Sequence, residues 1–224
     1  MKNRYINHTH ISEKKFREVL RHFAKDFTAE VTADLTNISR ITVNRLYASF
    51  RTRIAGLLGD KKKLGGEVEV DESYFGARRV RGKRGRGAKG KVPVVGLLKR
   101  HGKVYTQIIS NCTKEQLMPV LKGKILPKST VYTDGWTSYD GLITSGYKHH
   151  RIHHSENEFA RGKNHVNGIE SFWSYSKRRL LKFNGIHKTK FLLHLKESEF
   201  RWNMRISGVN MYRELLKNFR EYPL

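Results

Sequence analysis

Apolar residues recur with two different periods along this chain, and the period changes near residue 66. Before that point they are spaced by three and four, as on one face of an α-helix. This spacing predicts helices that begin near Ser12, Thr28 and Arg40. Beyond it, apolar and polar residues alternate, which predicts strands over residues 67–75, 92–98, 104–109 and 129–133. Helical spacing returns over residues 113–121, 165–177, 188–204 and 212–219, so this part of the chain is predicted to be α/β.

The first three predicted helices have the order and polarity of a helix-turn-helix domain. Residues 36–39 form a tight turn, and Val31 and Leu35 share a face of the second helix. The third helix has an apolar side with Ile41, Leu46, Phe50, Ile54 and Leu57. Its other side is polar and carries Arg40, Thr42, Asn44, Arg45, Ser49, Arg51 and Arg53. Arg can bind guanine and Asn adenine in the major groove, so Arg40, Asn44 and Arg45 are expected to contact DNA.

The alternative for this region is a plain three-helix bundle whose polar face is solvated. In either case the pattern predicts four segments. Residues 1–58 form the helical domain, and residues 59–66 form a glycine-flanked basic linker. Residues 67–205 form the α/β domain, and residues 206–224 form a helical tail.

Composition narrows the class of partner. The 224 residues include 45 Lys and Arg against 20 Asp and Glu, a formal net charge of +25. Such a charge favours a polyanion, with nucleic acid ahead of an anionic membrane surface. The single cysteine, Cys112, excludes an internal disulfide framework and a Cys-rich zinc site. No apolar run follows a basic start or is long enough to cross a bilayer, so a cytoplasmic protein is expected.

Three acidic residues are distinctive against this basic background. Asp71 lies within an alternating stretch, where a strand has little structural use for an acid. Asp134 follows a strand and precedes Gly135, a position that a turn former also occupies. Glu170 and Lys177 are seven residues apart on a predicted helix, so they differ by only about 20° around its axis. Each residue alone also fits an ordinary turn or an exposed helix face.

Together the acids form a more specific pattern. Asp71 and Asp134 are 63 residues apart, and Glu170 follows 36 residues later. Acids on two neighbouring strands and a helix can converge at one edge of a sheet, where they repel one another unless cations lie between them. Oxygen ligands select Mg²⁺ or Mn²⁺, and two such ions promote in-line displacement at a phosphodiester. We therefore expect two ions per site.

These residues resemble the motifs of a DDE transposase, and most of all those of bacterial insertion-sequence enzymes with a ribonuclease H-like catalytic domain. The matching segments are Val70-Asp71 with the Glu-Ser-Tyr-Phe-Gly that follows, Tyr-Thr-Asp134-Gly-Trp, and His165-Val-Asn-Gly-Ile-Glu170 followed by Lys177. The resemblance covers about residues 64–205 and implies a ribonuclease H-like mixed sheet flanked by helices. It implies that Asp71, Asp134 and Glu170 are the catalytic metal ligands and that Lys177 binds transposon-end DNA.

The chain departs from this family pattern in two places. Many relatives have a Cys-rich zinc ribbon before the helix-turn-helix, and one cysteine cannot form it, so a short form is expected. Some relatives use Asn in place of the third acid, and Asn167 lies one turn before Glu170. We retain Glu170 because a carboxylate binds Mg²⁺ better than an amide, with Asn167 and His165 as supporting residues near DNA.

A basic loop is predicted between the first two strands. Residues 76–91 contain five glycines, no acids and eight cations, namely Arg78, Arg79, Arg81, Lys83, Arg84, Arg86, Lys89 and Lys91. Glycine lets the backbone approach DNA closely, and the cations can displace condensed counterions. We expect this loop to bind DNA, although it also fits a solvated loop in the free protein.

The histidines and tryptophans near the acids allow more than one interpretation. The histidines of residues 149–154 invite a zinc site, but they lack helical spacing and cysteine partners, so a place near phosphate is favoured. Trp136 and Trp173 flank the expected ligands. A core position is favoured for both, with stacking on a base as the alternative.

The resemblance implies Mg²⁺-dependent cleavage at insertion-sequence terminal repeats, followed by attack of the freed 3′-hydroxyl on target DNA. It implies double-stranded DNA as the partner, a homodimer in the synaptic complex, and neither a membrane nor a small-molecule cofactor. A location with the bacterial nucleoid in the cytoplasm follows. Two alternatives remain, a structure-specific nuclease or resolvase of the same fold and a non-catalytic DNA-binding regulator.

Overall fold

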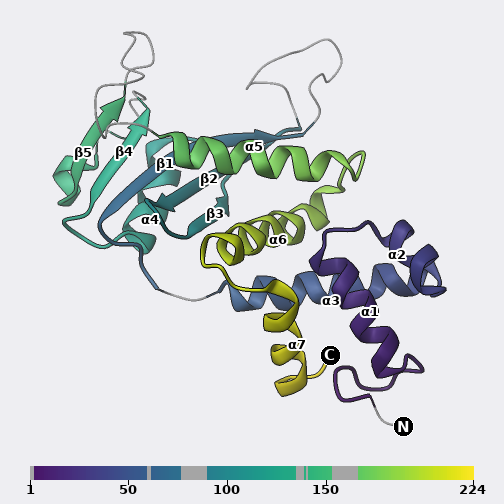
Figure 1. The fold of residues 1–224 in the computed structure, drawn as a ribbon. Helices are drawn as coiled ribbons and strands as arrows, with labels where there is room; N and C mark the ends of the chain where they lie inside the picture. Colours follow the sequence, from purple (N-terminus) through teal and green to yellow (C-terminus); the bar gives the residue numbers. More distant parts are fainter. Residues whose placement is uncertain (1–2, 60–61, 77–89, 135–138, 140, 153–165) are drawn as a thin grey trace. The chain divides into compact units, whose positions relative to one another are not determined.

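The structure is a computed structural model that describes all residues except 1–2, 60–61, 77–89, 135–138, 140 and 153–165 (Figure 1). The chain divides into two compact units. The first consists of Met1–Gly59 together with Met204–Leu224, and the second of Asp60–Asn203. In the described part of the chain, no helix is long and apolar enough to cross a membrane.

The helices of the first unit begin where the sequence supplies caps. They are α1 (Glu13–Ala24), α2 (Ala29–Thr36), α3 (Arg40–Leu57) and α7 (Met211–Glu221). The hydroxyls of Ser12, Thr28 and Ser39 each accept a hydrogen bond from the backbone N–H three residues on. Between α2 and α3, Asn37 adopts a left-handed conformation with φ of 53°, which makes the expected tight turn.

An aromatic core holds this unit together. The Phe16 ring meets those of Phe50 and Phe219 edge-on, with centroids 5.6 and 5.9 Å apart. Because Phe219 belongs to α7, the last helix of the chain completes the core of the first three. Arg53 of α3 also donates a hydrogen bond to Asn218 Oδ1 of α7, at 2.9 Å.

The faces of α3 differ from the predicted ones. Ile41 and Leu57, expected on the apolar side, are 67% and 39% exposed. Arg51, expected on the polar side, is buried with its guanidinium over the rings of Phe23 and Tyr47. The prediction was wrong for Ile41 because it lies on another side of the helix from the rest of the apolar set, and wrong for Leu57 because that residue is the last of the helix. At about 100° per residue, Leu46, which is five residues after Ile41, lies about 140° away from it around the helix axis.

The buried face of α2 is polar. Thr32 and Thr36 are fully buried, whereas Val31 and Leu35, which share the predicted apolar face, are exposed. Thr36 Oγ1 donates to the Thr32 carbonyl at 2.6 Å, so its hydroxyl is satisfied within the helix. A threonine of this kind can occupy a core position that a count of apolar residues does not identify.

The second unit is a five-stranded mixed sheet in the order β3-β2-β1-β4-β5. The strands are β1 (Glu67–Phe75), β2 (Val92–Lys99), β3 (Val104–Ile108), β4 (Thr130–Asp134) and β5 (Lys148–Ile152). The pairs β1–β2 and β2–β3 are antiparallel, whereas β1–β4 and β4–β5 are parallel. The predicted mixed sheet is confirmed.

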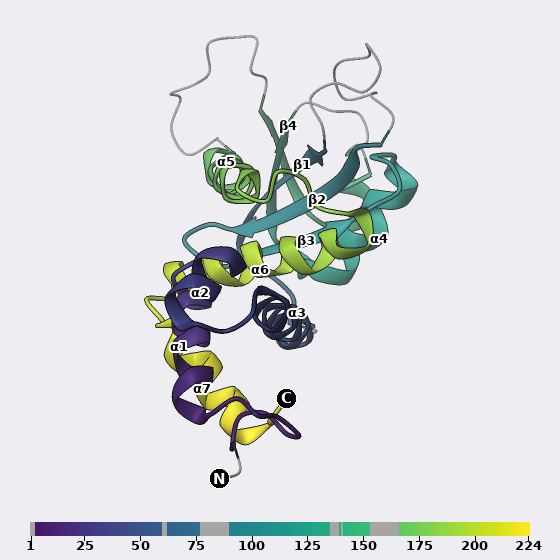
Figure 2. The same cartoon turned by 90° about the vertical axis from the view of Figure 1, so that its right-hand side faces the viewer.

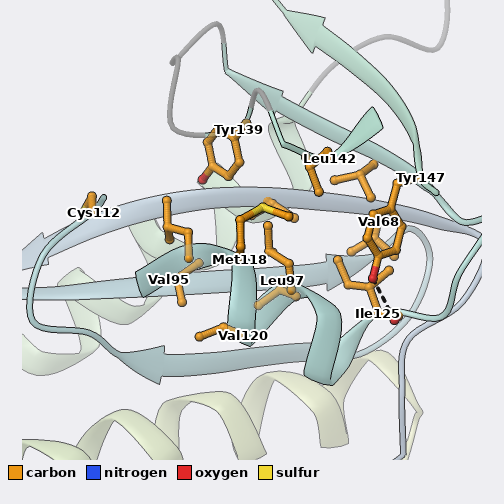
Figure 3. Packing of buried hydrophobic residues seen from close by; sticks show 14 of the residues in the cluster. Val68, Val95, Leu97, Cys112, Met118, Val120, Ile125, Tyr139, Leu142 and Tyr147 are labelled. Carbon is orange, nitrogen blue, oxygen red and sulfur yellow. Dashed lines mark hydrogen bonds between the residues drawn. The ribbon is translucent and has the colours of Figure 1, made fainter. Parts of the chain in front are cut away.

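Helices cover both faces of this sheet (Figure 2). The α4 helix (Lys114–Lys124) lies on one face and α5 (Asn167–Leu181) on the other. The α6 helix (Lys188–Ile206) contributes side chains to the core on the α5 face. A short 3₁₀ helix, η2 (Ile143–Ser145), precedes β5. The core on the α4 face includes Val95, Leu97 and Tyr139 (Figure 3). The core on the other face joins β1 and β2 to α5 and α6.

Polar side chains of α6 cover the edge strand β3. The Asn203 side chain both accepts a hydrogen bond from Val104 N, at 2.8 Å, and donates one to Val104 O, at 2.9 Å. Glu199 Oε2 accepts hydrogen bonds from Thr106 N and Thr106 Oγ1, at 3.0 and 2.6 Å. These contacts take the place of a further strand on that edge.

Candidate active site

Strand register brings the two aspartates to the same level of the sheet. The parallel pairing of β1 with β4 has an offset of 63 residues and ends at Glu69 and Tyr132. The same offset relates Asp71 to Asp134, one alternation beyond the last pair. Side chains two residues apart on a strand point to the same face, so Asp71 shares a face with Glu69. That is the face covered by α5, because Val68 and Val70 belong to the opposite core.

The three predicted acids and the lysine line one pocket. Its volume is about 540 Å³. Glu170 comes from the first turn of α5, and Lys177 lies two turns further along the same helix. The lining residues are Asp71, Glu72, Ser73, Asp134, Val166, Glu170, Trp173, Ser174 and Lys177. The structure therefore gathers residues separated by more than a hundred positions in the sequence into one hollow, beside the middle of β1 and the end of β4.

Asp71 carries the most perturbed charge of this pocket. The pKa of Asp71 is raised from 3.8 to about 6, and burial of the carboxyl is the largest cause. The negative charges of Asp134 and Glu170 contribute to this increase. Hydrogen bonds from the Glu72 backbone and from the Trp173 side chain oppose both effects. Asp71 thus interacts electrostatically with both other acids, and a cation in the pocket would stabilise its ionised form.

Trp173 orients Asp71. Its Nε1–H donates to Asp71 Oδ2 at 3.1 Å, and the side chain is only 4% exposed. The indole packs on β2 at Gly96, where an added Cβ would lie 2.5 Å from Trp173 Cζ2. The favoured core position of Trp173 is confirmed, and a buried indole cannot stack on a base. Its hydrogen bond to Asp71 was not predicted, and the only sequence signal was its place three residues after Glu170.

On the opposite face of β1, Glu72 is held by Tyr139. Tyr139 is fully buried, and its hydroxyl donates a hydrogen bond to Glu72 Oε1. Burial and the neighbouring Glu72 raise the pKa of Tyr139 well above its usual value, so the phenol keeps its proton. Because Tyr139 follows β4 in the chain, this contact joins a residue beyond β4 to β1. Neither residue was predicted from the sequence to support the site.

The donor chemistry of the pocket suits a hard divalent cation. Asp71, Asp134 and Glu170 supply carboxylate oxygens only, the ligands that Mg²⁺ and Mn²⁺ prefer. Among the residues that the structure describes, no three His, Cys, Asp or Glu side chains form a group able to hold a metal ion. The three carboxylates are therefore ligands of the right chemical type for Mg²⁺ or Mn²⁺. To coordinate one ion together, they would have to lie closer to one another than they do here.

The supporting residues are placed less uniformly. Lys177 lines the pocket, and its ammonium lies 5.8 Å from the centre of the Phe75 ring. Asn167 is the exposed first residue of α5 and does not line the pocket. His165 lies outside the described residues.

Much of the predicted DNA-binding surface falls outside the described part of the chain. This holds for Trp136, for the histidines at 153 and 154, and for seven loop cations, namely Arg78, Arg79, Arg81, Lys83, Arg84, Arg86 and Lys89. Of the remaining histidines, His149 Nε2 lies 2.9 Å from Thr133 Oγ1, and His150 stacks on Tyr132.

In the first unit, the residues predicted to contact DNA are accessible. Arg40, Asn44 and Arg45 are exposed on α3, close to the end that follows the tight turn. Ile41 is exposed beside them. An exposed Arg and Asn on the second helix of such a pair are compatible with reading of base edges.

Comparison with known proteins identifies relatives of this chain. Residues 63–203 match the family described as the ISXO2-like transposase domain. An uncharacterized transposase-like protein of Haemophilus influenzae is 44% identical over 117 residues, which are 51% of this chain and 94% of that protein. A protein of the transposable element ISH50 of Halobacterium salinarum is 28% identical over 177 residues, which are 72% of this chain and 60% of that protein.

Solved structures with a similar arrangement have little sequence in common with this chain. The catalytic core domain of BIV integrase is 12% identical and superposes with a TM-score of 0.40, covering 69% of this chain and 95% of that one. The Mos1 transposase paired-end complex with left transposon end is also 12% identical, with a TM-score of 0.33 and coverage of 92% and 79%. Superpositions this loose carry no information about chemistry.

Proposed function

The chain belongs to the ISXO2-like transposase domain family, and on that premise we propose that it is an insertion-sequence transposase that cuts DNA at terminal repeats and joins the freed ends to target DNA. The observation that carries the proposal is the single pocket lined by Asp71, Asp134, Glu170 and Lys177. Three carboxylates beside a cation, in a chain of net charge +25, suit a reaction at the phosphodiester backbone.

We assign Asp71, Asp134 and Glu170 as the ligands of two Mg²⁺ or Mn²⁺ ions, whose chemistry at a phosphodiester is to activate the attacking oxygen and to stabilise the leaving one. Trp173 donates a hydrogen bond to Asp71 Oδ2 and so fixes the orientation of that carboxylate. Lys177 binds a phosphate of the transposon end. Both steps are direct displacements, with water as the first nucleophile and the 3′-hydroxyl as the second.

DNA is held by further parts of the chain in this proposal. Residues 1–58 act as the DNA-reading domain, with base contacts from Arg40, Asn44 and Arg45, which are exposed on α3. The cations of residues 76–91, with Asn167 and His165, contact the backbone near the cut. Two ends must be processed together, so a homodimer in the synaptic complex is proposed, acting in the bacterial cytoplasm with the nucleoid.

The test is a joining assay. Wild-type protein and Asp134→Asn are incubated with labelled DNA carrying the terminal repeats that flank the gene, with Mg²⁺ and a target plasmid. We expect wild type to give both cut and joined DNA and Asp134→Asn to give neither, because an amide is a poorer ligand for Mg²⁺. Glu115→Gln is the matched control, since it removes an exposed carboxylate of the same unit, on α4, outside the pocket.

Each other outcome has a definite meaning. Joined product from Asp134→Asn at the wild-type level contradicts the site assignment. Cut DNA without joined product favours a nuclease or resolvase of this fold. Sequence-specific binding without cutting by wild type favours a regulator.

A further inference from the structure

The helix that carries Glu170 begins without a cap of its own. The residue at the start of α5, Val166, has no side chain able to accept a hydrogen bond from the first turn. The missing acceptor comes from β1, because Glu69 Oε2 accepts a hydrogen bond from Ile169 N at 2.9 Å. A carboxylate at this position also interacts favourably with the positive end of the helix dipole.

Glu69 is itself rigidly held. Its side chain is almost fully buried, and its second oxygen, Oε1, lies 3.1 Å from Arg100 Nε. The Arg100 guanidinium stacks 3.7 Å from the centre of the Tyr132 ring on β4. The Tyr132 hydroxyl in turn donates to Glu67 Oε1 at 2.7 Å. The carboxylate that caps α5 is therefore fixed to β1, to the end of β2 and to β4 together.

Gly168 of α5 leaves room for this contact. An added Cβ there would lie 2.8 Å from Glu69 Oε2 and 3.0 Å from Leu98 Cδ2. Alanine is preferred over glycine inside a helix by about 1 kcal/mol. A glycine in the first turn therefore lowers helix propensity, and what it permits is the close approach of Glu69 to the helix backbone.

Glu69 and Asp71 lie two residues apart on the same face of one strand. Ile169, which Glu69 holds, directly precedes Glu170. The hydrogen bond between Glu69 and Ile169 therefore links Glu170 to Asp71 directly. About a hundred residues separate the two acids along the chain.

We propose that Glu69 is a positioning residue of the active site, which fixes the first turn of α5 so that Glu170 faces Asp71 and Asp134. The role rests on the proposed function, in which these acids hold divalent cations. The competing interpretation is a buried ion pair with Arg100 that contributes to stability alone.

Two pairs of matched variants separate these interpretations. Glu69→Gln removes the charge of the cap, and Glu199→Gln removes a carboxylate of similar burial in the same unit, which bonds β3 and not α5. Gly168→Ala displaces Glu69 without changing any charge. Gly123→Ala adds the same methyl group to α4, where an added Cβ meets nothing within 4 Å.

Three measurements are made on each full-length variant. They are amide exchange of the peptide spanning residues 167–172, binding of Mn²⁺ alone by titration calorimetry, and the rate of joining with Mg²⁺. Thermal unfolding of each variant records any general loss of stability.

We expect Glu69→Gln and Gly168→Ala to speed exchange in the first turn of α5 and to reduce Mn²⁺ affinity and joining by roughly 10-fold to 100-fold. Glu199→Gln and Gly123→Ala should leave all three unchanged, even where Glu199→Gln lowers the melting temperature as much as Glu69→Gln. Because Gly168→Ala keeps every charged group, it remains informative if Glu69→Gln does not fold.

The proposal is overturned if Glu69→Gln and Gly168→Ala match their controls in exchange and in Mn²⁺ affinity. Wild-type protein that neither cuts nor joins DNA would count against the proposed function instead. In that case exchange and Mn²⁺ binding still decide whether Glu69 positions the acids.

Discussion

At the scale of single residues, the pocket holds the Asp71 carboxylate in surroundings that disfavour its negative charge. Asp71 is half-buried beside two other acids, and its raised pKa of about 6 reflects the cost of ionising it there. Trp173 and the Glu72 backbone offset only part of this cost. Such an arrangement is poor for stability and useful for binding a cation, because the cation removes the repulsion that the fold maintains.

This gives a prediction for the pH dependence of stability. The pKa of Asp71 is raised on folding, so the folded state holds this proton more tightly and loses stability as pH rises from about 4 to about 6. Asp71→Asn removes the ionisable group while keeping an oxygen that can accept from Trp173. In a chelator, this variant should gain up to about 3 kcal/mol of unfolding free energy over wild type at pH 7, and much less at pH 4.

Urea denaturation of both proteins at the two pH values measures the difference. Glu115→Gln serves as the control, because Glu115 is exposed and its pKa is lowered by hydrogen bonds with its own backbone and with Thr113. The expected gain should also shrink when Mg²⁺ replaces the chelator. A variant less stable than wild type at pH 7 in chelator would contradict the electrostatic account of the pocket.

At the scale of elements, contacts between side chain and backbone fix the two helices that carry and support the site. Glu69 of β1 bonds the first turn of α5, and Asn203 of α6 bonds both backbone groups of Val104 on β3. In each case a polar side chain satisfies backbone groups that an unpaired end or edge would leave exposed. The elements are thereby fixed in register as well as packed.

Asn203→Ala should destabilise the second unit. The substitution leaves the N–H and the carbonyl of Val104 without the partner that they now share, at a cost of about 1–3 kcal/mol for each buried group that finds no substitute. Denaturant unfolding and amide exchange at Val104 test this. Lys190→Ala, an exposed position on the same helix, is the control, and equal effects from both variants would refute the edge-covering role.

At the scale of the whole molecule, the net charge of +25 is distributed over both units and over the segment between β1 and β2. That segment alone contributes eight cations and no acid, next to the strand that carries Asp71. Counterion release makes such charges the main source of non-specific affinity for DNA. These cations alone would also attract an anionic membrane. The acids of the pocket favour DNA, because they suit a reaction at a phosphodiester.

Replacing Arg81, Lys83, Arg84 and Arg86 with Ala should therefore flatten the dependence of DNA affinity on salt. The slope of log K against log salt concentration should fall by up to about 0.9 for each phosphate contact that is lost. The effect should be the same for terminal-repeat DNA and for unrelated duplexes, because phosphate contacts do not read sequence. An unchanged slope in fluorescence-anisotropy titrations would remove this segment from the DNA interface.

The sequence alone predicted the local elements, because period, caps and turn residues act over a few neighbours. The helix starts at Ser12, Thr28 and Ser39 and the bounds of β1 agree with the structure. The motif around Asp71, Asp134 and Glu170 indicated the family for the same reason, since it is read from short segments. Whether these residues catalyse a reaction stays a prediction that the joining assay tests.

Only the tertiary structure decided which distant groups meet. It buried Arg51, exposed Ile41 and joined α7 to the first three helices. It also showed that Trp173 and Glu69, neither predicted to support the site, hold Asp71 and α5. The physical reason is that a contact between β1 and α5 depends on strand register and on the space left at Gly96 and Gly168. Neither is encoded in the pattern around any single residue.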